Sequence, residues 1–510
     1  MELSWLENLL QNKRTLWIVG ALAILLFLVT NLPWQLDDYD QAKQAFTSFE
    51  MIKEGHWFYQ HTPQERVATK PPLLGWVSAG LFALTRSWDV AWRLPSFLAA
   101  IALSILLYRA ANSAYRSIAA LIALSAFGLN LLSPRLATFV RTDMPLAFVM
   151  FLIGLLIWQK VREQEEWKPR DRIYLFALLT GAMLIKGPIV YAFLLPGIGI
   201  FEWWRRKSNA VSAWSGWWPW LASIGLFLLW VIGGILFVPG FFDQVVVREF
   251  IGRFGETIHR PQPLYFYLPQ LLHKFAPWSV LMILIAFLSL RPAGIGIRNA
   301  FRKISPETFW LICWVFGGLL VMSLIPSKRV DRIFPIVPPL CLLLAAQIAR
   351  CVPCRPSMSS AFGSTGHTPV ATENEATRGR IYRWSAVALL VSILFTSGYT
   401  ISKVISGYRD HRDALVIFGR EVRHEAAVHH WRYEALFTKD EGLLLYLRKT
   451  HFINLRRAVV EWNRGNLDAL VAPTEDAAAL MRKLRDAALS QLKSKEKKNK
   501  PGVGYVLITH

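Results

Sequence analysis

The sequence predicts a polytopic α-helical membrane protein with a small α/β domain at its C-terminal end. Of the 510 residues, 54% are apolar and 22 are Trp, and the apolar residues are concentrated in blocks. A helix needs about 20 apolar residues to cross a bilayer, and many of these blocks approach that length. Residues 403–510 instead alternate short apolar runs with helix-like stretches, which is typical of an α/β domain.

The hydrophobic blocks predict about 11 transmembrane helices in a membrane domain that covers residues 1–402. The first block has no small-residue cleavage site at its end, so we interpret it as a retained helix and not as a removed signal peptide. The predicted spans are 15–33, 91–109, 117–133, 144–160, 172–186, 188–203, 215–238, 274–290, 308–326, 333–350 and 383–402.

The basic loops predict the orientation of these spans. Lys and Arg are frequent before the first span and after every even-numbered one, and such residues accumulate on the cytoplasmic side. The amino terminus and residues 351–382 are therefore expected inside, and the first loop (34–90) and residues 403–510 outside. Residues 71–85 are apolar but short, and counting them as a span would invert this pattern. We therefore expect them to form a helix along the membrane interface.

The net charge of +22 does not indicate a nucleic-acid-binding protein. No basic soluble domain with interleaved aromatic residues is present, and cytoplasmic loops account for the charge. The four Cys do not form a disulfide framework, and the single C-x-x-C pair at 351–354 has no second pair that would complete a metal site. No cofactor is expected. A divalent metal is compatible with the sequence but is not indicated by it.

Charged and polar side chains that are unusual in a membrane protein fall on the predicted external face. They are Asp37, Asp38, Asp40, His56, Lys70, Arg141, Asp143, Lys186, Arg253, His259, Arg260, Lys328, Arg329 and Arg332. Cations beside carboxylates at headgroup depth suit an enzyme that acts on a lipid phosphate, because cations bind the phosphate and a carboxylate can handle the nucleophile. Taken singly, each Lys or Arg could instead be a side chain that snorkels to the interface. Asp143 could be a helix N-cap.

The first external loop has a predictable local structure. Residues 39–54 have the composition of a helix, and the interfacial helix follows at 71–85. Lys70 precedes Pro71 and Pro72, which excludes helix at Lys70 itself. Lys70 is therefore expected at the start of the interfacial helix, beside the carboxylates.

A series of short motifs, in order along the chain, resembles the bacterial GT-C glycosyltransferases. These enzymes are related to protein O-mannosyltransferases and to the aminoarabinose transferase that modifies lipid A. The motifs are LDDYDQA (36–42), GHW (55–57), TKPPLLGW (69–76), RLPS (93–96), RTDMP (141–145), IKGP (185–188), GRFGETIHRPQPLYFYLP (252–269) and PSKRVDRIFP (326–335). Three positions depart from the family pattern: Asp38 replaces Glu, His56 replaces Asp, and Thr69 stands where the lipid A enzymes have Glu.

The resemblance implies transfer of a sugar from a polyprenyl-phosphate donor, with inversion at the anomeric carbon, at a bacterial inner membrane. The acceptor would be lipid A, another glycolipid or glycan, or a protein hydroxyl. The catalytic carboxylate would be Asp37, supported by Asp38 and Asp143. The predicted substrate-binding residues are Lys70, Lys186, Arg253, His259, Arg260, Lys328, Arg329 and Arg332. The alternative is a transporter or flippase for a polyprenyl-linked sugar, but that class typically has charges or broken helices near the bilayer midplane.

The C-terminal segment (403–510) is expected to be an external, periplasmic domain. DALVIFG, LDALVAP and GYVLITH are predicted strands, and DEGLLLYLRKT and TEDAAALMRKLRDAALSQL are predicted helices.

Overall fold

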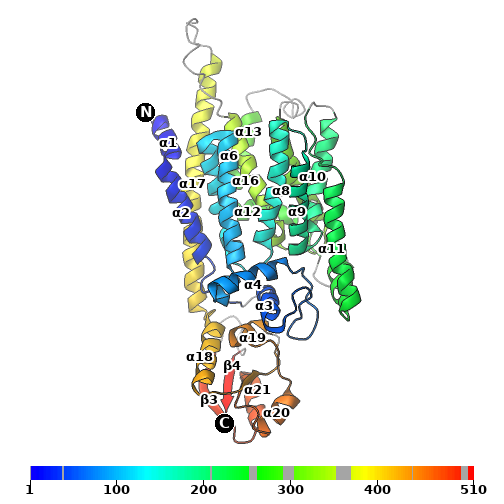
Figure 1. Cartoon of the computed structure of the whole chain (residues 1–510). Coiled ribbons are helices and arrows are strands. Elements are labelled where there is room, and N and C mark those ends of the chain that lie inside the picture. The colour runs from blue at the N-terminus through cyan, green and yellow to red at the C-terminus, as the bar shows by residue number, and fades with distance from the viewer. Residues whose placement is uncertain are drawn as a thin grey trace.

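The computed structural model describes residues 2–36, 39–206, 210–251, 261–290, 304–351, 369–438, 440–495 and 504–510. Long helices stand side by side in a bundle, and a smaller unit with a β-sheet caps the end opposite the amino terminus (Figure 1). The long helices are α2 (Lys13–Val29), α6 (Leu94–Gly128), α8 (Asp143–Glu163), α9 (Pro169–Lys186), α10 (Ile189–Arg205), α11 (Trp218–Phe237), α13 (Trp278–Leu290), α15 (Pro306–Leu324), α16 (Val337–Cys351) and α17 (Pro369–Arg409).

Shorter helices connect them. These are α1 (Glu2–Gln11), α5 (Trp88–Ala91), α7 (Ser133–Ala137), the π-helix η1 (Phe242–Ile251), the 3₁₀-helix η2 (Leu264–Phe266), α12 (Tyr267–Lys274) and the 3₁₀-helix η4 (Val330–Ile336).

Within the described ranges, six helices are long and apolar enough to cross a membrane, or eight if two bent pairs each count as one span. One bent pair is α1 with α2, at 54°, and the other combines η2 and α12 with α13, at 98°. The chain is therefore a multi-pass membrane protein, as predicted, while the number of 11 spans stays a prediction. Most of the predicted spans 91–109 and 117–133 lies in α6, whose backbone breaks at Arg116 (φ 71°) between them.

Glycines allow the closest helix contacts in the bundle. A Cβ on Gly197 of α10 would lie 2.8 Å from the Cys313 carbonyl oxygen of α15, and one on Gly317 would lie 2.6 Å from the Gly197 nitrogen. Small residues permit such close backbone approach, which is how helices associate where lipid gives no hydrophobic driving force.

The first loop forms a layer between the bundle and the C-terminal unit. Helices α3 (Tyr39–Glu54) and α4 (Leu73–Thr85) lie across the end of the upright helices (Figure 1). The apolar residues Phe46 and Phe49 of α3 are buried in the same core as Tyr446 of the C-terminal unit. The helices predicted at 39–54 and 71–85 are both confirmed, while the position of the second along the membrane interface stays a prediction.

The C-terminal unit is an α/β unit with a four-stranded sheet of order β1-β2-β4-β3. Strand β1 pairs with β2 in parallel, and the other two pairings are antiparallel. Its elements are α18 (Ala414–Val428), β1 (Tyr433–Ala435), α19 (Glu441–Leu447), α20 (Leu455–Asn463), β2 (Ala469–Pro473), α21 (Thr474–Met481), β3 (Ala488–Lys493) and β4 (Tyr505–Thr509).

Two local predictions in this unit were wrong. DALVIFG lies mostly in α18 and is not a strand, because Leu415, Phe418 and Val422 have helical spacing and pack into one core. The helix predicted after residue 473 ends at Met481. Asp486 has a left-handed φ of 53°, and the residues that follow form β3, paired to β4. The strands predicted in LDALVAP and GYVLITH, and the helix predicted in DEGLLLYLRKT, are confirmed.

Candidate active site

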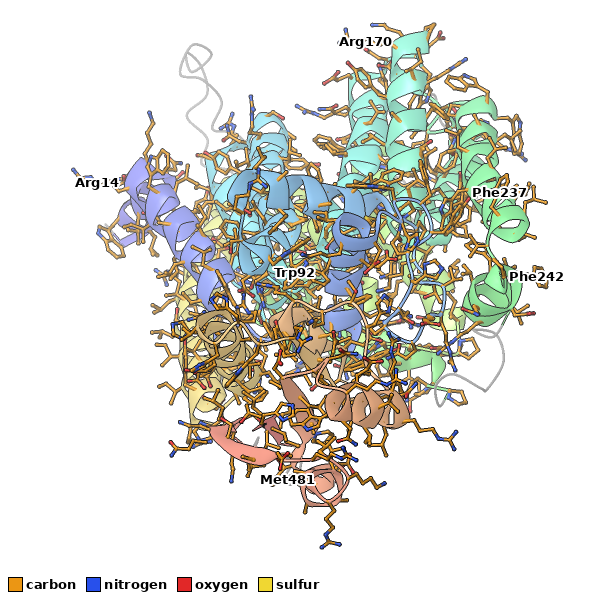
Figure 2. All side chains as sticks on the ribbon, turned by 60° about the horizontal axis from the view of Figure 1, so that its bottom comes forward. Arg14, Trp92, Arg170, Phe237, Phe242 and Met481 are labelled. Atoms are coloured by element: carbon orange, nitrogen blue, oxygen red, sulfur yellow. The ribbon has the colours of Figure 1, made fainter. Side chains whose placement is uncertain are left out.

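Charged side chains from five segments meet where the bundle contacts the first loop. The segments are the start of α3, the stretch before α4, the start of α8, the end of α9 and the turn that leads into η4. Helix α3, which carries Asp40 at its start, lies across the end of the bundle next to the C-terminal unit (Figure 1), so the cluster lies at that end. With this end turned forward, Arg170 lies on the opposite side of the bundle from the C-terminal unit (Figure 2).

Arg141 is the centre of one half of this cluster. Its Nη1 donates a 2.8 Å hydrogen bond to Oδ2 of Asp331, and its Nη2 lies 3.5 Å from Oδ2 of Asp40. Arg329 donates a hydrogen bond to the same Asp40 oxygen. The side chains of Arg141 and Asp331 are only 8% and 10% exposed, so these are largely buried ion pairs. Pairing offsets the cost of burying these charges, since an unpaired buried charge is costly.

The pKa of the Asp40 carboxyl is consistent with an ionised partner in these ion pairs. Burial raises the pKa of the Asp40 carboxyl, but the positive charges of Lys70, Arg329 and Arg141 outweigh it, so the pKa lies below its usual value. Asp40 is therefore an anion that ties the cations together, not a proton donor.

Lys186 and Asp143 form the second half of the cluster. The Lys186 ammonium donates a hydrogen bond to Oδ1 of Asp143, and their side chains are 17% and 7% exposed. Lys186 ends α9 just before Gly187, which has a φ of 76°, and Asp143 begins α8. The pair thus joins two helix ends. A carboxylate bound by an ammonium is a weakened base, which favours a positioning role for Asp143.

Lys70 lies between the two halves. Burial lowers the pKa of its ammonium to about 8; the charges of Lys186 and Lys43 act in the same direction, and Asp40 and Asp143 oppose them. Among the described residues, no hydrogen bond or ion pair within 4.0 Å holds the Lys70 ammonium. As predicted, Lys70 is not helical, and α4 begins at Leu73. A partly buried cation among further cations is suited to binding an anion.

The turn before η4 and η4 itself supply two further cations, Lys328 and Arg332. The Lys328 ammonium donates a 2.9 Å hydrogen bond to the Gln262 carbonyl oxygen, and burial lowers the pKa of this lysine. Arg332 donates hydrogen bonds to the carbonyl oxygen and the hydroxyl of Ser327, at 2.7 and 3.2 Å. Arg332 therefore also holds the turn that carries Lys328.

Several predicted site residues lie outside the described residues. They are Asp37, Asp38, Arg253, His259 and Arg260. Their roles stay predictions. Of the other predicted site residues, Lys70, Asp143, Lys186 and Arg329 lie in the cluster with Arg141.

Sequence reasoning assigned no role to two carboxylates that organise the cluster. From the sequence, Asp40 is predicted only to lie on the external face, and Asp331 is part of the motif PSKRVDRIFP but has no predicted function. The signal for Asp331 was a carboxylate between three cations in one short turn. The signal for Asp40 was weaker, because Asp37 and Asp38 precede it.

A family model described as dolichyl-phosphate-mannose-protein mannosyltransferase matches residues 69–239. The chain is 27% identical over 354 residues to the undecaprenyl phosphate-α-4-amino-4-deoxy-L-arabinose arabinosyl transferase 1 of Sodalis glossinidius, which covers 66% of this chain and 59% of that protein. It is 28% identical over 351 residues to the corresponding transferase of Aeromonas salmonicida, with 66% and 60% covered. The chain thus matches about three-fifths of the length of these relatives.

The fold is similar to that of a protein of known structure. The crystal structure of ArnT from Cupriavidus metallidurans bound to undecaprenyl phosphate superimposes with a TM-score of 0.68 at 16% identity, covering 96% of this chain and 97% of that chain. The resemblance to GT-C glycosyltransferases predicted from the motifs is confirmed, and so is the predicted fold class of a polytopic helical membrane protein.

Proposed function

We propose that this chain is an integral membrane glycosyltransferase of the GT-C class that transfers a sugar from a polyprenyl-phosphate donor to an acceptor outside the cytoplasm. The observation that carries the proposal is the partly buried Lys70 ammonium among further cations, at one end of a fold like that of a transferase solved with undecaprenyl phosphate. The names of the relatives favour undecaprenyl phosphate as the carrier and 4-amino-4-deoxy-L-arabinose as the sugar.

The cluster suggests how the chain assists transfer. Lys70, Lys186 and Lys328 hold the carrier phosphate, and Arg141 and Asp40 fix the elements that present them. An acceptor oxygen attacks the anomeric carbon from the face opposite the phosphate. The bond from the anomeric carbon to the phosphate oxygen breaks, and the carrier phosphate leaves with the electron pair, stabilised by the cations. Asp37, with Asp38, takes the proton of an acceptor hydroxyl, or orients the acceptor if it is already an anion.

A basic cavity favours an acidic glycolipid as the acceptor. It has a volume of about 500 Å³ and lies between the first loop and the C-terminal unit. Its lining includes Lys53, Arg86, Arg423, Arg448, Phe82 and Trp88. Burial, and to a lesser extent the neighbouring Arg423, lower the pKa of Arg448 to about 10, so its guanidinium keeps its positive charge at neutral pH. We propose that a phosphate of the acceptor binds in this cavity.

We propose an orientation with the amino terminus and residues 351–382 in the cytoplasm and residues 34–90 and 403–510 outside. The support is the basic bias of the predicted inner loops and the position of the first loop and the C-terminal unit at the same end (Figure 1). Single cysteines at Glu65 and Thr365 test it. An impermeant maleimide applied to intact cells should label Glu65→Cys and not Thr365→Cys. The reverse pattern would reject the orientation.

The experiment that tests the activity is transfer by the purified protein. It is supplied with undecaprenyl phosphate-α-4-amino-4-deoxy-L-arabinose and lipid A, and the products are analysed by mass spectrometry. Glycosylated lipid A together with free undecaprenyl phosphate would support the proposal. Failure to convert the donor with any glycolipid or protein acceptor would reject it in favour of the transporter.

A further inference from the structure

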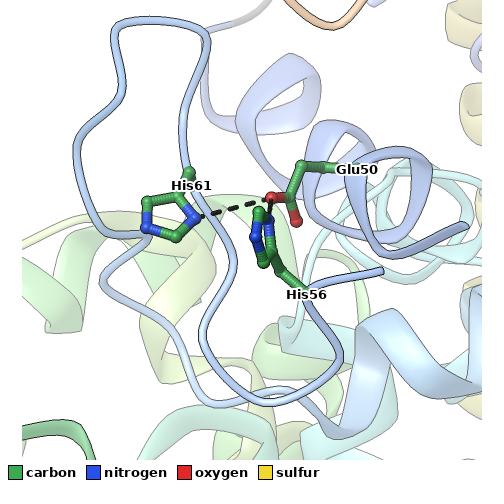
Figure 3. Close-up of side chains that lie close together, drawn as sticks. All are labelled: Glu50, His56 and His61. Carbon is green, nitrogen blue, oxygen red and sulfur yellow. Dashed lines mark hydrogen bonds and ion pairs between the residues drawn. The ribbon is translucent and has the colours of Figure 1, made fainter. Parts of the chain in front are cut away.

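Three potential metal ligands meet in the first loop, away from the cationic cluster. Glu50 lies in the last turns of α3, and His56 and His61 lie in the loop that follows (Figure 3). One ligand atom from each residue lies within 4.8 Å of the other two. Glu50 follows Asp40 by roughly 15 Å along the same helix, at a rise of 1.5 Å per residue. The three residues are thus distinct from the proposed phosphate site.

The Glu50 carboxylate is buried and incompletely satisfied. It is 2% exposed; its Oε1 is hydrogen-bonded to Nδ1 of His56 and lies 3.6 Å from Nδ1 of His61. Its Oε2 has no hydrogen-bond partner among the described residues, and neither has the buried Nδ1 of His61. Buried polar atoms without partners are uncommon and costly, and a bound ion or water commonly satisfies them.

We propose that Glu50, His56 and His61 bind one divalent transition-metal ion, of which Zn²⁺ has the best-matched chemistry. Two imidazoles and one carboxylate form a set of three protein ligands that Zn²⁺ uses with a water in the fourth position. Metal–ligand distances of about 2.0–2.2 Å place neighbouring ligand atoms of a tetrahedral site roughly 3.4 Å apart. The 3.6 Å separation of Glu50 and His61 is close to this value.

The exposure of the ligands is consistent with such a site. The side chains of His56 and His61 are 49% and 31% exposed, whereas that of Glu50 is 3% exposed. The carboxylate therefore forms the inner wall, and the imidazoles leave an outer side on which water completes the coordination.

The position of the ligands indicates a structural role. Gly55, with a φ of 82°, turns the chain out of α3, and His61 pairs with Val67 in a β-bridge. A metal ion would tie the end of α3 to the start of the bridged loop. The loop continues through Ala68, whose N–H bonds to the Gln60 carbonyl oxygen at 2.7 Å, to Lys70. The metal thus fixes the segment that presents Lys70.

The competing explanation is a metal-free pair between a protonated His56 and Glu50. Metal content distinguishes the two, because the ligand imidazoles must be neutral to bind the ion. The purified protein is stripped with a chelator, dialysed and titrated with Zn²⁺ alone or with Co²⁺ alone. We expect one equivalent of Zn²⁺ bound. Co²⁺ should show the strong visible absorption of four-coordinate cobalt, which hydrated Co²⁺ lacks.

Substitutions test whether Glu50 and His56 are the residues that bind the metal ion. His56→Ala and Glu50→Gln should each weaken Zn²⁺ binding by at least about 100-fold, since even an outer-shell partner is worth 10–100-fold. Glu425→Gln is the matched control, because Glu425 also lies beside two histidines, 4.0 Å from Nδ1 of His424 and 3.4 Å from Nε2 of His429. It should retain the wild-type affinity.

Hydrogen exchange of the wild-type protein provides a readout that needs no variant and no activity. Zn²⁺ should slow exchange of the amides in residues 55–69 and leave the C-terminal unit unchanged. The proposal is overturned if the protein binds less than stoichiometric Zn²⁺ and Co²⁺ stays octahedral. It is also overturned if Glu50→Gln and Glu425→Gln bind Zn²⁺ equally well.

Discussion

Arg141 and Asp331 are joined by a hydrogen bond of 2.8 Å although 190 positions separate them in the chain. The bond ties the segment before α8 to η4, and a second contact of Arg141, at 3.5 Å, reaches Asp40 of α3. One guanidinium thus holds three elements that surround the proposed phosphate site. Arg141 is therefore as much a structural residue as a candidate ligand.

Arg141→Ala should destabilise the protein. The change leaves Asp331 buried without its main partner, and breaking a buried pair by removing one member costs about 3–5 kcal/mol. Thermal unfolding in detergent measures the effect. Arg141→Ala/Asp331→Ala should lose less than the two single variants together, because the double change removes both charges. Additive losses would show that the pair is not coupled.

Lys70→Met should weaken binding of undecaprenyl phosphate by about 10- to 100-fold. A charge-assisted hydrogen bond to phosphate is worth about 1.5–3 kcal/mol, and Met keeps the length of the side chain. Lys328→Met should act in the same direction. Isothermal titration in detergent gives the affinities. The control is Lys168→Met, an exposed lysine near the opposite end of the bundle, which should bind normally. Unchanged affinity in Lys70→Met would favour a snorkelling lysine.

Donor binding should weaken as pH rises above 8. In the free protein the pKa of Lys70 is about 8, so the charged form falls about tenfold for each further pH unit. The donor phosphate is a diester with a single acidic proton, so it carries the same one negative charge throughout this pH range. The affinity for the donor should therefore decrease as the pH increases. Lys70→Arg keeps its charge and should flatten the profile. An equally steep profile in Lys70→Arg would assign the titration to another group.

Asp37→Asn should lower the rate of transfer and leave donor binding intact. Loss of a general base typically costs 10²–10⁴-fold, and removing an anion takes nothing favourable from a bound phosphate. Asp143→Asn should have a smaller effect on turnover, because Asp143 pairs with Lys186 and positions it. Single-turnover rates and donor affinity are measured separately. Normal turnover in Asp37→Asn, with none in Asp143→Asn, would make Asp143 the base.

Arg423→Glu should impair use of the acceptor. It reverses a charge in the basic cavity, while Lys53, Arg86 and Arg448 remain. We expect a raised KM for lipid A and an unchanged affinity for undecaprenyl phosphate. Arg420→Glu, on the same helix α18 but not lining the cavity, is the control for net charge. Equal KM values for the two variants would place the acceptor elsewhere.

The sequence predicted the elements that have a local cause. Helix α3 was expected at residues 39–54 from composition, and the Pro pair after Lys70 correctly excluded helix there. Contacts between residues that are far apart in the chain had no such local cause and could not be predicted. Nothing local distinguishes Asp331 as the partner of Arg141, and the loop geometry that brings His61 to Glu50 follows from tertiary contacts, such as that of the Val67 N–H with Gln244 at 2.7 Å.

Tertiary contacts also explain the two wrong predictions in the C-terminal unit. DALVIFG was predicted to be a strand, but the helical spacing and burial of Leu415, Phe418 and Val422 determined α18. Strand β3 is an edge strand with mostly exposed or partly exposed residues, so its sequence resembles a solvated helix. These residues form a strand because they pair with β4, which lies further along the chain.

The most direct test of the central claim is the fate of the donor in proteoliposomes. Purified protein is reconstituted with undecaprenyl phosphate-α-4-amino-4-deoxy-L-arabinose and lipid A, and both lipids are followed by mass spectrometry over time. A glycosyltransferase consumes the donor only with acceptor present and yields one undecaprenyl phosphate for each modified acceptor, and Lys70→Met slows this conversion. Donor that crosses the bilayer chemically unchanged, at the same rate with and without acceptor, would contradict the account.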